Sequence, residues 1–203
     1  NISQASVLID PTSQARVAGQ LPSIFKGQIK SFEAVNATLK AAQSSRLTFE
    51  ELGRATPAAA SGGVLVGATP AETLGTLSVL ASVFKSGETA ADRIKAFTTK
   101  AGLTEELSGR GIVGAVEGLQ ALPESRRKKI LGESQELNVA FSKLAENLES
   151  IKIRTQEVQK AIDATGTSRR SRENRLISFF SFCARRDLDR ILDLDGCCGS
   201  NIR

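Results

Sequence analysis

The chain has 203 residues, a net charge of +5, and no histidine, methionine, tryptophan or tyrosine. The absence of histidine removes the usual general base and the most common metal ligand, which argues against many classes of enzyme. Because the apolar residues are chiefly small or aliphatic, we expect closely packed helices and a core that neighbouring copies help to complete. The mild basic excess permits contact with DNA or anionic lipid without requiring it.

The first part of the chain is predicted to hold an irregular lead-in and one helix. Pro11 and Gly19 interrupt any hydrophobic period in residues 1–21. From residue 22 to residue 42, apolar residues recur every three or four positions and line one face of a helix. These residues are Phe25, Ile29, Phe32, Val35, Leu39 and Ala42.

Two strong helix starts follow, at Thr48 and Thr69. In each, the threonine oxygen can accept from an amide three residues on, while Glu51 or Glu72 reaches back to the threonine. The second start also has Pro70 at the first helical position, where its missing N–H costs nothing. Glycines and Pro123 bound the helices of this region, which we expect at residues 49–61, 70–86, 88–101, 111–122 and 123–131.

The most regular hydrophobic pattern comes after Gly132. Eight positions, here called the seam, alternate in steps of four and three, which is coiled-coil spacing. They are Leu137, Phe141, Leu144, Leu148, Ile151, Thr155, Val158 and Ile162. Two interpretations remain open: the seam joins another copy of the chain, or its helix packs on the preceding hairpins.

Residues 47–160 contain two stretches with a particular arrangement of small and apolar residues. They are LTFEELGRATPAAASGGVLVGATPAETLGTLSVLASVFKSGETAADRIKAF and GIVGAVEGLQALPESRRKKILGESQELNVAFSKLAENL. This pattern resembles the central helical region of tape measure proteins from long-tailed (siphovirus-type) bacteriophages. The matching residues are Glu51, Leu52, Pro57, Glu72, Leu74, Leu80, Gly87, Ala90, Leu119, Leu122, Ile130 and Leu131.

The resemblance implies an elongated structural protein of the virion, placed in the tail lumen or tail tip after a stage in the host cytoplasm. Such a protein sets tail length, leaves ahead of the genome and helps to form a passage through the host envelope. Its implied partners are further copies of itself, in a homo-oligomer, and the tail tube and tail tip proteins. The host membrane on ejection and DNA are further candidate partners.

Residues 55–84 carry one formal charge, that of Glu72, among mostly small and apolar side chains. A helix of this length would span about 45 Å, enough to cross a bilayer core of about 30 Å. Pro57, Gly62, Gly63, Gly67 and Pro70 interrupt the stretch, so we do not expect a permanent membrane span. An ordinary buried hairpin and a metastable hairpin that enters lipid after release both remain open.

We find no sequence pattern that predicts catalysis, a cofactor or a metal ion. Residues 109–114 match Gly-x-Gly-x-x-Gly, but we expect no strand before them, so the match is weak support for nucleotide binding. Adjacent carboxylates such as Glu50 and Glu51 point to different helix faces rather than into one cleft. We therefore expect a protein that is not an enzyme.

Beyond residue 166 the sequence becomes rich in arginine, and all three cysteines of the chain lie there. Candidate phosphate contacts are Arg169, Arg170, Arg172 and Arg175, because arginine-rich segments bind phosphate without sequence preference. The alternative function is thus a helical binding module whose basic C-terminal end engages nucleic acid or an anionic membrane. An altered reading frame would also explain the change in composition.

The expected fold is therefore all-α and elongated, with helical hairpins followed by a long heptad-patterned helix. We expect its core to be completed by self-association or by neighbouring virion proteins. The four expected segments are a lead-in (1–21), a hairpin region (22–132), a coiled-coil-like helix (133–166) and an arginine- and cysteine-containing tail (167–203).

Overall fold

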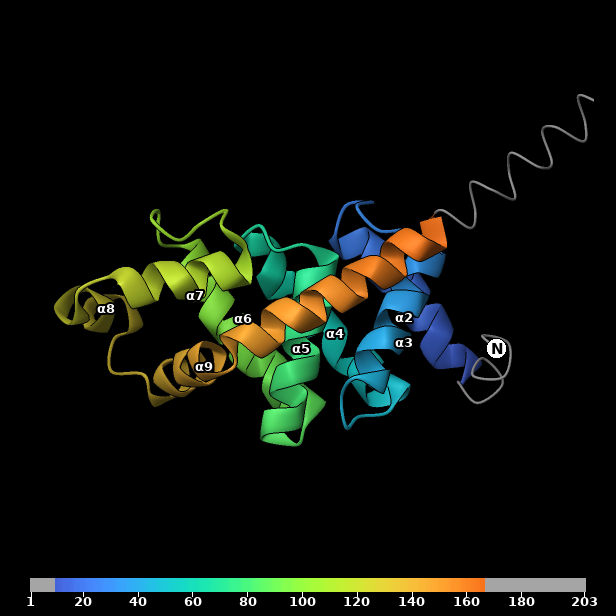
Figure 1. The fold of residues 1–203 in the computed structure, drawn as a ribbon, viewed down its shortest axis with the longest axis horizontal. Coiled ribbons are helices and arrows are strands. Elements are labelled where there is room, and N and C mark those ends of the chain that lie inside the picture. Colours follow the sequence, from blue (N-terminus) through green and yellow to red (C-terminus); the bar gives the residue numbers. More distant parts are fainter. Residues whose placement is uncertain (1–9, 167–203) are drawn as a thin grey trace, which may run out of the picture. The chain divides into compact units, whose positions relative to one another are not determined.

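The structure is a computed structural model that describes residues 10–166 (Figure 1). Within these residues all regular secondary structure is helical, so the prediction of an all-α fold is confirmed. Residues up to Asp163 belong to one compact unit, and a second unit begins at Ala164. Of that second unit, residues 164–166 are described and are helical.

The helices of the first unit follow one another with short connections. In chain order they are α2 (Pro11–Ile24), α3 (Ser31–Gln43), α4 (Phe49–Leu65), α5 (Pro70–Phe84), α6 (Gly87–Gly102), α7 (Gly111–Ala121), α8 (Glu124–Leu131) and α9 (Gln135–Glu146). A further helix starts at residue 148 and continues to the end of this unit at residue 163; we call it the last helix.

The centre of the first unit is formed by α4, α5 and α6. The most extensive interface joins α4 to α6, and α5 packs against both. The pair α2 and α3 lies on one side of this centre and α7 to α9 on the other, while the last helix runs across α5 (Figure 1). The helices approach closely because buried alanines line their contacts, among them Ala55, Ala59, Ala60, Ala90 and Ala91.

The helix α4 continues through Gly62 and Gly63 to Leu65, although we expected the glycine pair to end it. A Cβ on Gly62 would overlap the Thr98 hydroxyl of α6 and would lie 2.9 Å from Lys95 Cα. Glycine therefore allows α4 and α6 to approach at this point. Tertiary packing outweighs the low helix propensity of glycine, which costs about 1 kcal/mol per residue.

The prediction of an irregular lead-in is wrong for residues 11–21, which belong to α2, and its residues 1–9 lie outside the described structure. Asp10 Oδ2 accepts a hydrogen bond of 2.9 Å from the Ser13 N–H, and Pro11 takes the first helical position. The single helix expected over residues 22–42 is also wrong. It is divided between α2 and α3 by left-handed backbone at Lys26 (φ 50°) and Gly27 (φ 81°).

The remaining helices before Gly132 agree closely with their predicted bounds, but the single helix expected after it is broken. Asn147, with φ −107° and ψ 14°, separates α9 from the last helix. Its side-chain amide donates to the Lys143 carbonyl at 2.9 Å and so stabilises the break. The chain therefore changes direction in the middle of the seam (Figure 1).

Three contacts of different kinds hold the last helix. Thr155 packs directly on the backbone of α5 at Gly75, where no side chain intervenes. Lys152 Nζ lies 2.9 Å from Glu117 Oε1 of α7, and the Ser44 hydroxyl after α3 donates to Glu157 at 3.5 Å. The last helix thus bridges elements that are far apart in the sequence.

Candidate functional site

Glu72, the single charge in residues 55–84, lies in the first turn of α5. The Thr69 hydroxyl oxygen accepts from the Glu72 N–H at 3.1 Å, as the predicted cap requires. The Glu72 carboxylate itself is not confined to its own helix. Its Oε1 accepts a hydrogen bond of 2.7 Å from the Val113 N–H, in the first turn of α7.

Glu72 therefore supplies a cap for α7 from another helix. Arg110, the N-cap residue of α7, makes no side-chain cap bond within the described structure. The first N–H groups of a helix lack intrahelical partners, and the positive end of the helix dipole favours an anion. The Glu72 carboxylate meets both requirements, and the N–H of Ile112 also contributes to its electrostatic environment.

Glycines allow the Glu72 carboxylate, the turn before α5 and the turn before α7 to come together. A Cβ on Gly111, which has φ +75°, would lie 2.5 Å from Glu72 Oε2. The Gly111 N–H also donates to the Val66 carbonyl at 2.8 Å. Gly67 has φ +75°, and a Cβ on it would lie 3.1 Å from Gly109 Cα. We call the contact of residues 66–72 with residues 109–113 the Glu72 junction.

Burial raises the pKa of the Glu72 carboxyl above its ordinary value. The opposing contributions, which lower the pKa, come from the backbone N–H groups of Val113, Thr69 and Ile112. Because the pKa is raised in the folded state, folding favours the protonated form of this group. The contribution of Glu72 to stability is therefore greatest below the ordinary pKa of a glutamate and falls as the pH rises through the raised pKa.

The Glu72 junction also explains the Gly-x-Gly-x-x-Gly match at residues 109–114. This segment does open a helix, as the pattern suggests, but it follows the helix α6 rather than a strand. The Val113 N–H, which would face a bound phosphate, instead faces the carboxylate of Glu72. The chain thus provides its own anion at this helix start.

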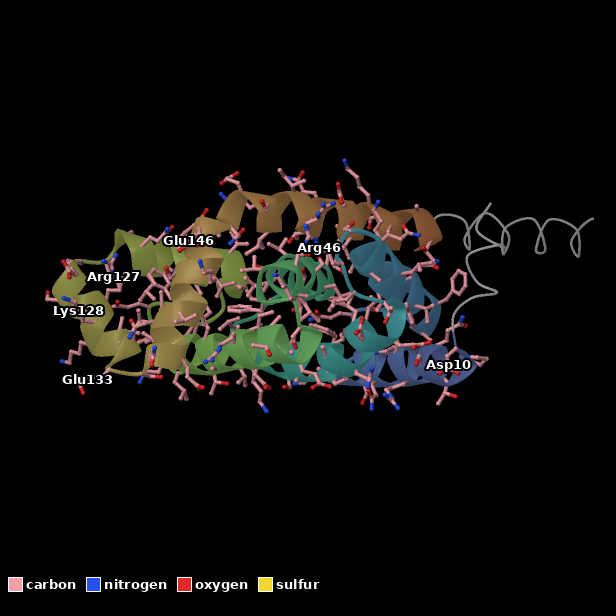
Figure 2. All side chains as sticks on the ribbon, turned by 90° about the horizontal axis from the view of Figure 1, so that it is seen from below. Asp10, Arg46, Arg127, Lys128, Glu133 and Glu146 are labelled. Atoms are coloured by element: carbon pink, nitrogen blue, oxygen red, sulfur yellow. The ribbon has the colours of Figure 1, made fainter. Side chains whose placement is uncertain are left out.

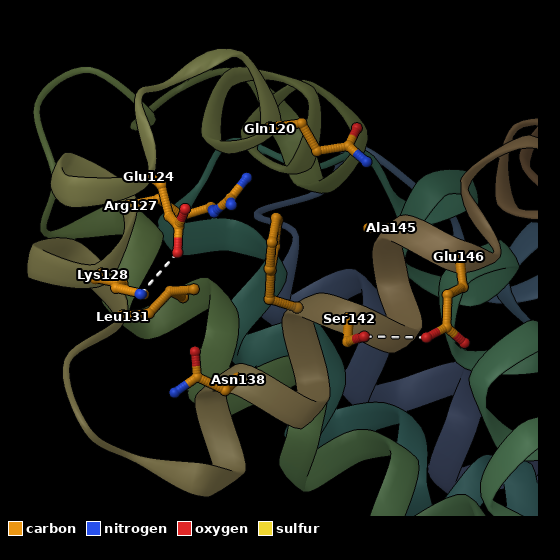
Figure 3. Close-up of a pocket in the computed structure, with 10 residues that line it drawn as sticks. Gln120, Glu124, Arg127, Lys128, Leu131, Asn138, Ser142, Ala145 and Glu146 are labelled. Carbon is orange, nitrogen blue, oxygen red and sulfur yellow. Dashed lines mark hydrogen bonds and ion pairs between the residues drawn. The ribbon is translucent and has the colours of Figure 1, made fainter.

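A groove of about 370 Å³ lies between α8 and α9 (Figure 3). Leu131, Phe141 and Ala145 give it an apolar lining, and polar side chains of both helices surround them. The Arg127 guanidinium carbon lies 6.0 Å from the centre of the Phe141 ring and connects the two walls. Figure 2 places Arg127 and Lys128 at the end of the first unit that α8 forms.

Apart from Arg127, the charged residues of the groove interact along their own helices. Lys128 and Glu124 of α8 are 2.7 Å apart, and the Ser142 hydroxyl of α9 donates to Glu146 at 3.0 Å (Figure 3). Neither sign of charge dominates the lining. Residues 10–166 contain no cluster of three or more metal-ligating side chains.

The structure places the predicted seam within the core of the same unit. Leu144, Ile151 and Val158 are buried, and the other five seam residues are partly buried. The buried seam residues pack on the chain's own helices, and association of the seam with another copy stays a prediction. The predicted phosphate contacts Arg169, Arg170, Arg172 and Arg175 lie outside the described residues.

None of the described helices is long and apolar enough to cross a membrane. Comparisons of the chain with family models, with curated proteins and with solved structures found no significant match.

Proposed function

We propose that this chain is a structural protein of a phage tail, of the tape measure kind, which acts through packed helices without catalytic turnover. The observation that supports this best is the position of the residues that resemble the family. Five of them are fully buried at helix contacts: Leu52, Leu74, Leu80, Ala90 and Leu119. A protein that acts through packed helices requires buried positions of this kind at its helix contacts.

Two further residues of the resemblance have specific packing roles. A Cβ on Gly87 would lie 2.9 Å from a Leu47 methyl carbon and 3.3 Å from Ala55 Cβ, so glycine lets α6 begin against α4. Glu72 links α5 to α7 through the Val113 N–H. Residues of the resemblance therefore lie at the contact of α6 with α4 and at the contact of α5 with α7.

In the proposed role, the protein lies in the tail lumen or tip, with further copies and the tail tube and tip proteins as partners. Purified tails should then contain the chain in a fixed ratio to the tube protein, as measured by quantitative mass spectrometry. Leu74→Asp, which places a charge in the core, should prevent tail assembly. Lys129→Ala, on the exposed face of α8, should leave assembly intact. Normal tails that lack the chain would refute the proposal.

The alternative function, binding of nucleic acid or anionic membrane, is favoured by the charge of residues 167–203. This segment contains eight arginines and five acidic residues. If it binds DNA, the full chain should retard DNA in a gel at low salt, and the affinity should fall steeply as salt rises. A chain that ends at residue 166 should then lose this binding, and equal binding by both chains would exclude the arginines as its cause.

A further inference from the structure

The groove between α8 and α9 combines an apolar floor with a basic wall (Figure 3). We propose that this groove binds residues 187–195 of another copy of the chain, a segment that is both acidic and apolar. The inference goes beyond the proposed tail function and does not depend on it, because it follows from the groove and from the sequence of that segment.

The floor of the groove offers apolar surface in a defined position. Phe141 and Ala145 of α9 line the groove and are only partly buried. The Phe141 ring stacks on Phe97 of α6, with 6.4 Å between the ring centres, and Arg127 lies against the same ring. The groove volume of about 370 Å³ falls in the range of small-ligand pockets, about 300–1,000 Å³. The floor can therefore receive aliphatic side chains of a partner.

The wall that α8 forms is basic, although the charges of the lining itself are balanced. Residues 126–129 of α8 are four consecutive cations, and Glu124 is the single carboxylate of this helix. Lys128 lines the groove and pairs with Glu124 at 2.7 Å while its side chain remains 75% exposed. Because an exposed pair of this kind contributes little to stability, Lys128 can exchange Glu124 for a carboxylate of a partner.

The sequence of residues 187–195 is complementary to both features of the groove. It contains four aspartates against one arginine, and its other four residues are leucine or isoleucine. Leu188, Ile191 and Leu192 have the spacing with which an amphipathic helix fills a groove, and the aspartates beside them can pair with α8. A nucleic acid would match the basic wall but would leave the apolar floor uncovered, so the groove favours an acidic peptide.

The position of the groove favours another copy as the source of the segment. The groove lies at the end of the first unit that α8 forms, and the last helix ends at the opposite end of this unit (Figures 1 and 2). Residues 148–163 of that helix carry the chain about 24 Å away from the groove, at 1.5 Å per residue. A groove at one end and a chain exit at the other allow copies to associate head to tail. Residues 167–186 span at most about 70 Å when extended, which is enough to reach a neighbouring copy.

Cross-linking of the full wild-type chain provides the first test. Unlabelled and isotope-labelled protein are mixed under reducing conditions, which prevent disulfides between copies, and treated with a carbodiimide, which joins a lysine amine to a carboxylate in contact with it. We expect mass spectrometry to find links from Lys128 to aspartates of residues 187–195, including links between labelled and unlabelled peptides. Links between peptides of the same label alone would mean that the segment binds its own groove, and would overturn the proposal. The absence of these links would overturn it as well.

Variants of the full chain test the groove and the segment separately. Ser142→Trp places an indole in the groove from an exposed position of α9, and Ile191→Asp removes an apolar anchor of the segment. Each should weaken self-association about tenfold or more in sedimentation equilibrium, and each should remove the Lys128 links. Ser150→Trp is the matched control, because Ser150 is exposed on the last helix and does not line the groove, and it should associate like wild type.

The same measurements can refute the proposal in two ways. Self-association of Ser142→Trp or of Ile191→Asp at wild-type strength would show that the groove or the segment takes no part in it. A wild-type chain that remains a monomer at every concentration would exclude binding between copies. If Ser142→Trp does not fold, as judged by circular dichroism, cross-linking of the wild-type chain decides alone.

Discussion

At the scale of single residues, Gly75 shows how this fold uses glycine within helices. It lies where the last helix crosses α5, and a Cβ there would be 2.7 Å from Thr155 N and 2.9 Å from Thr155 Cα. These neighbours are backbone atoms, which do not move aside as a flexible side chain does. Glycine is therefore required at position 75 because the last helix lies against α5 there, and not because the backbone turns.

Gly75→Ala should destabilise the protein by up to about 2 kcal/mol. Overpacking of a close contact costs about 1–3 kcal/mol, which exceeds the gain of about 1 kcal/mol in helix propensity. The matched control is Gly19→Ala in α2, where a Cβ would meet no atom of the described residues within 4 Å. Gly19→Ala should stabilise the protein, as measured by urea unfolding followed by circular dichroism at 222 nm. Equal effects of the two changes would contradict the close contact.

Glu72 shows what the sequence reveals about a site and what it leaves open. Its isolation among uncharged residues, and its place three residues after Thr69, are visible in the sequence and predict a helix cap. Its bond to Val113, which is 41 positions away, depends on how α5 and α7 meet in space. A local sequence pattern carries no information about how α5 packs against α7, so the Glu72 junction was not predicted.

At the scale of elements, the start of α4 follows its local sequence closely. The Glu51 N–H donates to Thr48 Oγ1 at 3.2 Å, and the Thr48 N–H donates to Glu51 Oε2 at 2.9 Å, as the predicted capping box requires. The Thr48 N–H lowers the pKa of the Glu51 carboxyl. The stabilisation from Glu51 is therefore present above the ordinary pKa of a glutamate and is lost as the pH falls through the lowered pKa.

Thr48→Ala should lower the free energy of unfolding by about 1 kcal/mol at neutral pH, because it removes one partner of the box. Thr89→Ala is a suitable control. Thr89 lies in the first turn of α6 and takes part in the cap through its backbone N–H, which donates to the Ser86 hydroxyl. Its replacement should change stability by less than about 0.5 kcal/mol in the same urea titration. A larger loss from Thr89→Ala than from Thr48→Ala would be inconsistent with the box.

The accuracy of the predicted elements depends on whether local signals or packing determine each end. Helices α5 to α8 begin and end near proline, threonine and glycine signals, and their bounds were predicted well. The start of α2 has an equally local signal in Asp10 and Pro11, which the hydrophobic pattern obscured. The extension of α4 to Leu65 has no local signal, because it depends on the contact of Gly62 with α6.

At the scale of the first unit, what covers the seam residues shows whether one chain completes its own core. Leu144, Ile151 and Val158 are buried among the chain's own helices, so the heptad pattern is used within this unit. Periodicity identified the buried face of α9 and the last helix. It carried no information about what covers that face, because the same spacing serves a partner chain and a neighbouring helix equally well.

Ile151→Lys distinguishes these two uses of the seam. If Ile151 packs within one chain, a lysine there buries an unpaired charge and should lower stability by roughly 3 kcal/mol or more. The molar mass from light scattering should stay the same as long as the protein remains folded. Ile153→Lys is the matched control, because Ile153 is 57% exposed on the same helix. It should leave both the melting temperature and the mass close to wild type.

The opposite result would give the seam a different role. A wild-type oligomer that Ile151→Lys converts to a folded monomer would mean that Ile151 faces another copy in solution. The last helix would then have to leave Gly75 and expose the backbone of α5, since Thr155 occupies that position in the structure. Ile153→Lys changes only the exposed face of the last helix. If Ile151→Lys dissociates the oligomer and Ile153→Lys does not, the interface therefore lies on the face that carries Ile151.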